Sequence, residues 1–219
     1  MRVLWQLFDN NKKWAARMRE ASPDFFEVLF RQQQPDYLWI GCADSRVPAN
    51  EITGLLPGEL FVHRNVANLV IHTDLNCLSV IQYAVEVLRV GHIIVCGHLG
   101  CGGIRAVLEG EKMGLIDNWL RHVQDTAGKH RALLDSARTD EARQDLLCRL
   151  NVIEQVCNLV STPIVRDAWD RGQALSLHGW IYDIRDGILH DLGLCVTRPD
   201  EIGAFYRKAV GEVSGAGDA

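Results

Sequence analysis

The chain has 219 residues, of which 47% are hydrophobic and 23% charged, and its formal net charge is -5. These values are typical of a globular protein with a substantial core, and the length suits one α/β domain. An acidic balance without a basic patch argues against nucleic acid as a partner, and no apolar stretch is long enough to cross a membrane. Since the first residues also lack the apolar run of a signal peptide, we expect a cytoplasmic protein.

The first part of the chain predicts a helical arm. Apolar residues at helical spacing indicate a helix over residues 3–20. Ser22, Pro23 and Asp24 then supply a cap, a first-turn proline and a first-turn acid for a second helix, which reaches about Gln33. We therefore treat residues 1–34 as an arm that packs on another surface. At the other end of the chain, we expect residues 212–219 to form a disordered tail.

Strands and helices alternate in the rest of the chain, which predicts an α/β fold. Apolar runs indicate strands over residues 37–41, 59–63, 92–96 and 174–182, and a hairpin partner over residues 187–192. Helical patterns cover residues 74–90, 103–109, 116–126 and 141–160, and another helix begins at Thr162 and Pro163. The pattern predicts a single domain with a mainly parallel central sheet, a C-terminal antiparallel hairpin and flanking helices.

Candidate metal ligands follow two of the predicted strands. Cys42 comes at the end of the first, and His98 and Cys101 come directly after the third. Because the carboxyl ends of parallel strands meet at one edge of the sheet, we expect these side chains to form one site. Two thiols and an imidazole suit zinc, and three protein ligands with a contested fourth position are typical of a catalytic zinc site.

The fourth position is contested because Asp44 and Arg46 follow Cys42 at alternate positions. In an extended segment all three side chains point the same way, so that Arg46 can hold Asp44 through a bidentate ion pair. Asp44 paired with Arg46 leaves the metal open, whereas Asp44 bound to the metal closes the site, which gives a hypothetical pH-dependent switch. The alternative is a permanently closed structural site, and Arg46 argues against it.

These motifs, together with residues 61–68 (Phe-Val-His-Arg-Asn-Val-Ala-Asn), resemble the β-class carbonic anhydrases, and the similarity runs over nearly the whole chain. The resemblance implies reversible hydration of CO₂ to bicarbonate and a proton by attack of zinc hydroxide. It implies one Zn²⁺ per subunit, held by Cys42, His98 and Cys101, with Asp44 and Arg46 as a catalytic dyad. It also implies a homodimer or dimer of dimers in which the arm wraps a partner subunit.

Two further sets of residues gain a role only from the resemblance. Four residues occupy positions of the family's CO₂ pocket: Gln33, Phe61, Val66 and Tyr83. Three more resemble a second, non-catalytic bicarbonate pocket of one subgroup, whose occupation favours the closed site: Trp39, Arg64 and Tyr182. Acidic pH and bicarbonate should then suppress activity. Without the resemblance, most of these apolar and aromatic side chains would be assigned to the core.

Two alternatives remain open from the sequence. One is an enzyme with the same scaffold that hydrolyses a CO₂ analogue such as carbonyl sulfide or carbon disulfide. The other is a catalytically silent zinc protein that serves as a binding module or scaffold.

Overall fold

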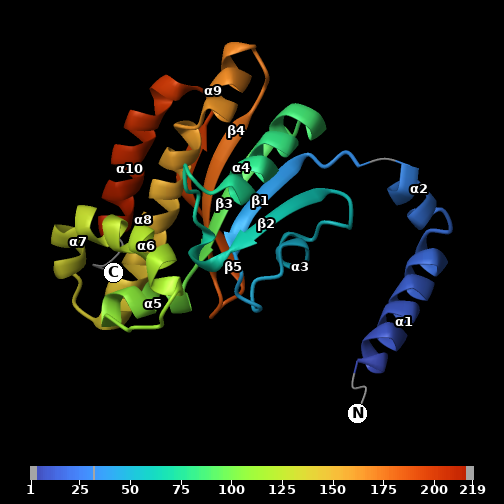
Figure 1. Ribbon diagram of the computed structural model, residues 1–219, viewed down its shortest axis with the longest axis horizontal. Coiled ribbons are helices and arrows are strands. Elements are labelled where there is room, and N and C mark those ends of the chain that lie inside the picture. Colours follow the sequence, from blue (N-terminus) through green and yellow to red (C-terminus); the bar gives the residue numbers. More distant parts are fainter. Residues whose placement is uncertain (1–3, 32, 216–219) are drawn as a thin grey trace. The chain divides into compact units, whose positions relative to one another are not determined.

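The computed structural model describes residues 4–31 and 33–215 (Figure 1). The chain divides into two compact units, residues 1–34 and 35–219. The first unit contains α1 (Trp5–Ala21) and α2 (Phe25–Arg31), in agreement with the two expected helices. Val3 and Gln32, which we placed in those helices, lie outside the described residues. Within this unit the Trp14 and Phe26 rings meet edge to face, with centroids 5.7 Å apart.

The second unit is built on a five-stranded sheet with the order β2-β1-β3-β4-β5. The strands are β1 (Tyr37–Cys42), β2 (Leu60–Asn65), β3 (His92–His98), β4 (Ser176–Asp183) and β5 (Ile188–Val196). The first four strands are parallel, and β5 pairs antiparallel with β4. The predicted α/β class and the C-terminal hairpin are confirmed.

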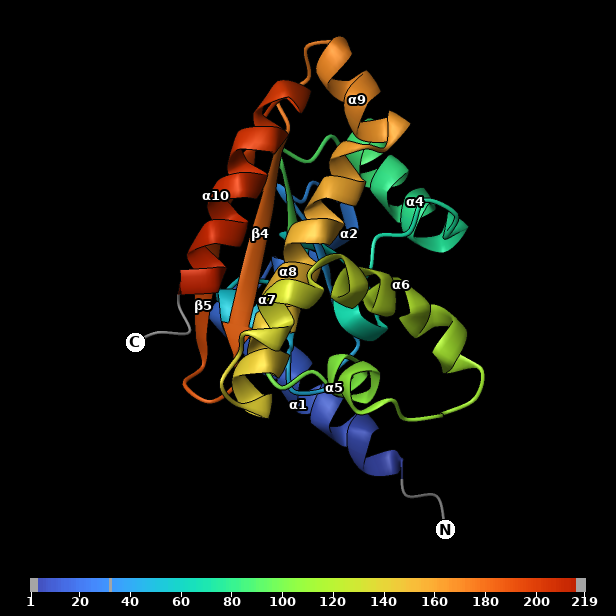
Figure 2. The same ribbon diagram turned by 90° about the vertical axis from the view of Figure 1, so that its left-hand side faces the viewer.

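Helices cover the sheet and connect its strands. They are α3 (Ala49–Thr53), α4 (Leu75–Gln82), α5 (Gly102–Glu109), α6 (Ile116–Lys129), α7 (Arg131–Asp135), α8 (Asp140–Val160), α9 (Pro163–Asp170) and α10 (Ile202–Gly215), with short turns η1 (Val66–Asn68), η2 (Tyr83–Leu88) and η3 (Pro199–Glu201). Figure 2 shows α8 and α10 side by side, where α8 packs on β3 and β4 and α10 packs on β5. Among the described residues, none of the helices has the length and apolar character needed to cross a bilayer.

Three differences from the sequence prediction concern helices. The single helix expected over residues 74–90 is α4 followed by the π-helical segment η2, and it ends where Arg89 adopts a left-handed conformation. The helices α3, α7 and α10 were not predicted. The expected disordered tail is wrong for residues 212–215, because they belong to α10 and Val213 is buried in the core. Residues 216–219 lie outside the described residues.

Apolar side chains form a cluster on each side of the sheet. The larger cluster lies under α4, α5, α6, α8, α9 and α10. The smaller one includes Trp39 and Tyr182. Trp39 packs so closely over the strand that a Cβ atom on Gly41 would lie 2.3 Å from its Nε1 atom. A side chain at position 41 would therefore displace the indole.

A partly buried carboxylate joins α8 to α6 and α10. Glu154 accepts hydrogen bonds from Lys129 Nζ at 2.7 Å, His130 Nε2 at 2.8 Å and the Tyr206 hydroxyl at 2.8 Å. Burial alone would raise the pKa of Glu154, but these three donors outweigh it and lower the pKa from 4.5 to about 2. The charged form of Glu154 thus stabilises the folded protein.

We expect Glu154→Gln to destabilise the protein at neutral pH by about 3 kcal/mol, because the pKa falls from 4.5 to about 2 and one pKa unit corresponds to about 1.4 kcal/mol. A folded-state pKa below the ordinary value gives stability that is present above pH 4.5 and is lost as the pH falls towards 2. The difference in free energy of unfolding between wild type and variant should therefore shrink over that range. Denaturant unfolding at a series of pH values measures it, and a difference that does not change with pH contradicts the assignment.

Candidate active site

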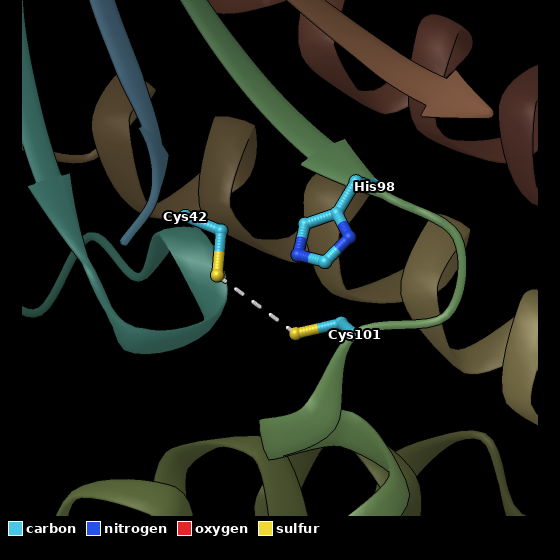
Figure 3. A group of neighbouring side chains, drawn as sticks. All are labelled: Cys42, His98 and Cys101. Atoms are coloured by element: carbon cyan, nitrogen blue, oxygen red, sulfur yellow. Dashed lines mark hydrogen bonds between the residues drawn. The ribbon is translucent and has the colours of Figure 1, made fainter. Parts of the chain in front are cut away.

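The ends of two parallel strands bring three metal-binding side chains together. Cys42 ends β1, His98 ends β3, and Cys101 immediately precedes α5. All three are buried, and one donor atom from each lies within 4.8 Å of the others. Figure 3 shows the two thiols and the imidazole facing a common point. The structure thus brings together the trio that the sequence placed at one edge of the sheet.

The geometry and donor types of this trio fit zinc. The two Sγ atoms are 3.9 Å apart, and two sulfurs bound at about 2.3 Å to a tetrahedral ion would be separated by about 3.8 Å. The His98 Nδ1 atom lies 3.0 Å from the Leu99 carbonyl oxygen and donates to it, which leaves Nε2 unprotonated. Nε2 is buried and has no hydrogen-bond partner among the described residues. An unpaired buried nitrogen is costly unless it binds something, so it supports a metal at this point.

The two thiols share a hydrogen bond, which lowers the pKa of one and raises the pKa of the other. The hydrogen bond from Cys101 lowers the pKa of Cys42, although burial opposes the shift. The hydrogen bond with Cys42 and burial both raise the pKa of Cys101. Without metal, the pair therefore holds one proton, and a divalent ion that binds both sulfurs must displace it.

Asp44 is paired with Arg46, as the spacing predicts. Arg46 donates from Nε to Asp44 Oδ1 at 2.9 Å and from a terminal nitrogen to Oδ2 at 2.7 Å, and its backbone N–H also reaches Oδ1. The hydrogen bonds from Arg46 lower the pKa of Asp44, so the carboxylate stays charged. Asp44 Oδ2 lies 3.6 Å from His98 Nε2. The carboxylate is thus beside the three ligands but held by the guanidinium.

Arg64 links β2 to the segment that carries these groups. Its Nε donates to the Cys42 carbonyl oxygen at 2.8 Å, and a terminal nitrogen donates to the Asp44 carbonyl oxygen. Trp39, Arg64 and Tyr182 lie on one face of the sheet, as their strand registers require. The buried Trp39 Nε1 has no hydrogen-bond partner among the described residues. The Trp39 indole N–H and the Arg64 guanidinium, which lie on the same face of the sheet, are groups that could bind an anion.

The expected CO₂-pocket residues divide between the two units. The rings of Phe61 and Tyr83 contact each other with centroids 5.9 Å apart, and both belong to the second unit together with Val66. The Val66 carbonyl oxygen accepts a hydrogen bond from Trp119 Nε1 at 2.8 Å. Gln33 is an exposed residue of the first unit.

The sequence prediction missed a second group with metal-ligand chemistry. His63, Asp74 and Cys77 each offer a donor atom within 4.8 Å of the others. Two of them already have structural contacts: Asp74 caps α4 through the Asn76 N–H, and His63 Nε2 lies 3.3 Å from Asn65 Nδ2. Burial raises the pKa of Cys77 to about 12, so its thiol stays protonated. These contacts explain the group as part of the core, and its residue spacing gave no signal of a site.

The α/β fold with this Cys-His-Cys site defines a class of protein, and comparison with known proteins identifies it. Residues 37–189 match the family model for carbonic anhydrase. A carbonic anhydrase of Emericella nidulans is 44% identical over 189 residues, covering 86% of this chain and 83% of the relative. A carbonic anhydrase of Candida albicans is 37% identical over 190 residues, covering 85% of this chain and 67% of the relative.

Solved structures agree with this match. A Coccomyxa β-carbonic anhydrase in complex with acetazolamide superposes with a TM-score of 0.89 at 39% identity, covering 93% of this chain and 92% of that one. A tetrameric β-carbonic anhydrase of Sordaria macrospora superposes with a TM-score of 0.85 at 37% identity, covering 90% of this chain and 100% of that one. The chain belongs to the β-class carbonic anhydrase family. It is therefore a lyase that hydrates CO₂, and the alternative hydrolysis of carbonyl sulfide or carbon disulfide is not favoured.

Proposed function

We propose that this protein hydrates CO₂ at one zinc ion per subunit, held by Cys42, His98 and Cys101. The observation that carries the proposal is the buried trio, with sulfurs 3.9 Å apart and a His98 Nε2 that has no hydrogen-bond partner in the described part of the chain. When bound, zinc supplies the Lewis acidity that makes water a nucleophile near neutral pH. A catalytically silent zinc protein is disfavoured, because a purely structural site needs neither Asp44 nor the guanidinium beside it.

The surrounding side chains have distinct tasks in this proposal. Asp44 accepts a hydrogen bond from the attacking water, and Arg46 holds the carboxylate in place through its two parallel hydrogen bonds. CO₂ is small and apolar, and the contacting rings of Phe61 and Tyr83 with Val66 offer it an apolar wall. For Gln33, a polar contact with the substrate rests on the family resemblance alone. The proton of the water finally leaves to solvent.

We propose that Asp44 also switches the site off. If Asp44 left Arg46, its carboxylate would be free to act as a further ligand of a metal held by Cys42, His98 and Cys101, and the site would then have no place for the attacking water. Bicarbonate bound by Trp39, Arg64 and Tyr182 favours that closed form, as in the subgroup that this trio resembles. Two observations support this: Trp39 Nε1 finds no hydrogen-bond partner within residues 4–31 and 33–215, and Arg64 donates to the carbonyl oxygens of Cys42 and Asp44. An anion that binds Arg64 therefore competes with contacts that fix the Asp44 segment.

Trp39→Phe tests this switch, because it keeps an aromatic ring but removes the indole N–H. We expect wild type to lose activity at acidic pH and with added bicarbonate. For each protein, the activity that remains under these conditions is expressed as a fraction of its activity at alkaline pH. This fraction should be at least about fivefold larger for the variant than for wild type. Stopped-flow CO₂ hydration and zinc content are measured across pH. Trp39→Ala provides the larger truncation, and identical pH profiles for wild type and both variants would contradict the switch.

The arm provides the expected contact with a second copy. The relative from Sordaria macrospora is described as tetrameric. None of the described residues of α1 is buried. Four large apolar side chains of the helix and its N-cap are exposed: Leu4, Trp5, Leu7 and Phe8. We propose a homodimer or dimer of dimers in the cytoplasm, with the arm wrapped around a partner subunit.

A further inference from the structure

The chain turns between two of the metal ligands, at Leu99 and Gly100 (Figure 3). Gly100 has a φ of 69°, in the left-handed region that side chains disfavour, and it is exposed to solvent. Glycine also has more backbone freedom than any other residue. Cys101 follows this turn, is 2% exposed and immediately precedes α5. The position of its thiol therefore depends on the contacts that hold the turn.

Two neighbouring elements hold the first part of the turn. The Leu99 N–H donates to the Tyr182 carbonyl oxygen on β4 at 2.9 Å. A terminal nitrogen of Arg46, which also bonds Asp44, donates to the Gly100 carbonyl oxygen at 3.3 Å. The turn is thus joined to the sheet and to the ion pair before the chain reaches the next ligand.

Gln144 on α8 holds the last part of the turn. Its Nε2 donates to the Cys101 carbonyl oxygen at 3.2 Å. The same oxygen accepts a hydrogen bond from the Arg105 N–H at 3.0 Å, and a carbonyl oxygen has two lone pairs for two such donors. The bond from Arg105 joins Cys101 to its own helix, α5. The bond from Gln144 joins it to α8, which packs on β3 and β4.

The surroundings of Gln144 make it a suitable position for a substitution. Its side chain is partly buried and forms part of the wall of two pockets, of about 210 and 360 Å³. Arg46 and Gly100 line the smaller pocket, and Arg105 and Glu109 line the larger one. Because these pockets lie next to the side chain, its replacement should remove the hydrogen bond without disturbing the core.

We infer that Gln144 is a positioning residue for the metal centre: its hydrogen bond to the Cys101 carbonyl oxygen holds the peptide group of this ligand, so that the thiol stays beside Cys42 and His98. The inference rests on the proposed zinc site. A ligand that is already held in place loses little freedom when the metal binds, which favours the bound state. Without this bond, the turn can move about Gly100, and the Cys101 thiol is no longer fixed at the distance that the metal requires.

Gln144→Met tests this role, because methionine has a similar length but no N–H donor. We expect zinc to leave the variant about 10-fold faster than wild type, or more, when the zinc-loaded proteins are mixed with a chromogenic chelator. In the cobalt-substituted protein, the sulfur-to-cobalt charge-transfer band should shift, because it depends on the geometry at the sulfurs. Gln144→Glu keeps the shape of the side chain but replaces the donor with a carboxylate oxygen. It should release zinc faster to a similar extent.

Gln173→Met is the matched control. Gln173 is another partly buried glutamine, and its Nε2 donates to the Val85 carbonyl oxygen in η2 at 2.9 Å. The control variant therefore loses a hydrogen bond of the same kind from a peptide group that carries no ligand. Its zinc release should stay within about twofold of wild type, and its cobalt band should not shift.

The two proposals fail in different ways. If wild type binds no zinc, the proposed zinc site is wrong and this inference falls with it. If wild type binds zinc but Gln144→Met releases it at the wild-type rate, or Gln173→Met releases it equally fast, the inference alone is wrong. It is also wrong if Gln144→Glu releases zinc as slowly as wild type, because the donor is then not what holds Cys101. If Gln144→Met does not fold, Gln144→Glu gives the same comparison.

Discussion

Cys101→Ser is expected to remove zinc and to lower CO₂ hydration by more than about 10³-fold. Serine has nearly the same shape, but its hydroxyl is not ionised near neutral pH and cannot replace the thiolate ligand. Without the ion, the remaining groups have no means of generating a nucleophile, and most of an enzymatic acceleration that typically exceeds about 10⁶-fold is lost. Zinc content by mass spectrometry and stopped-flow hydration measure the two effects together.

The control for this variant is another cysteine of the same chain. Cys157→Ser changes a half-buried thiol on α8 whose pKa is raised to about 12 by burial, so it is not a candidate thiolate. This variant should keep its zinc and its activity. A Cys101→Ser protein that retains stoichiometric zinc and wild-type activity would show that the ligand assignment is wrong.

The candidate metal ligands were predictable because a short sequence pattern around each of them is enough to locate it. Each ligand follows a continuous apolar run, and the carboxyl ends of parallel strands must meet at one edge of the sheet. The Asp44 and Arg46 pair was also predictable, since alternate residues in an extended segment face the same way. The structure confirms that arrangement by the two hydrogen bonds between these side chains.

Other features depend on contacts between distant parts of the chain. Asn151 and Gln155 look like exposed positions of a helix, and only the placement of α8 over the turn at Ala67 gives them partners. The tail was expected to be disordered because chain termini commonly fray, but packing of Val213 into the core keeps residues 212–215 in α10. The π-helical segment at Tyr83 likewise has no periodic signal in the sequence.

Arg46→Lys is expected to lower CO₂ hydration by about 10²-fold while zinc content remains at the wild-type level. Lysine keeps the positive charge but provides a single point donor in place of the planar fork that holds both oxygens of Asp44. A loosely held carboxylate both loses its alignment with the attacking water and becomes free to bind the metal. Positioned proton acceptors contribute about 10²–10⁴-fold in enzymes, which sets the size of the expected loss.

The comparison that isolates this effect uses a second arginine. Arg105 makes an exposed contact of 4.0 Å with Glu109, one turn apart on α5, so Arg105→Lys should leave zinc content and rate unchanged. If Arg46→Lys keeps its zinc and hydrates CO₂ at the wild-type rate at every pH, the bidentate pair has no part in catalysis. If it loses zinc, Arg46 acts on the ligands and not on Asp44. A slow, zinc-loaded variant is the outcome that places control of the fourth metal position in the Asp44–Arg46 pair.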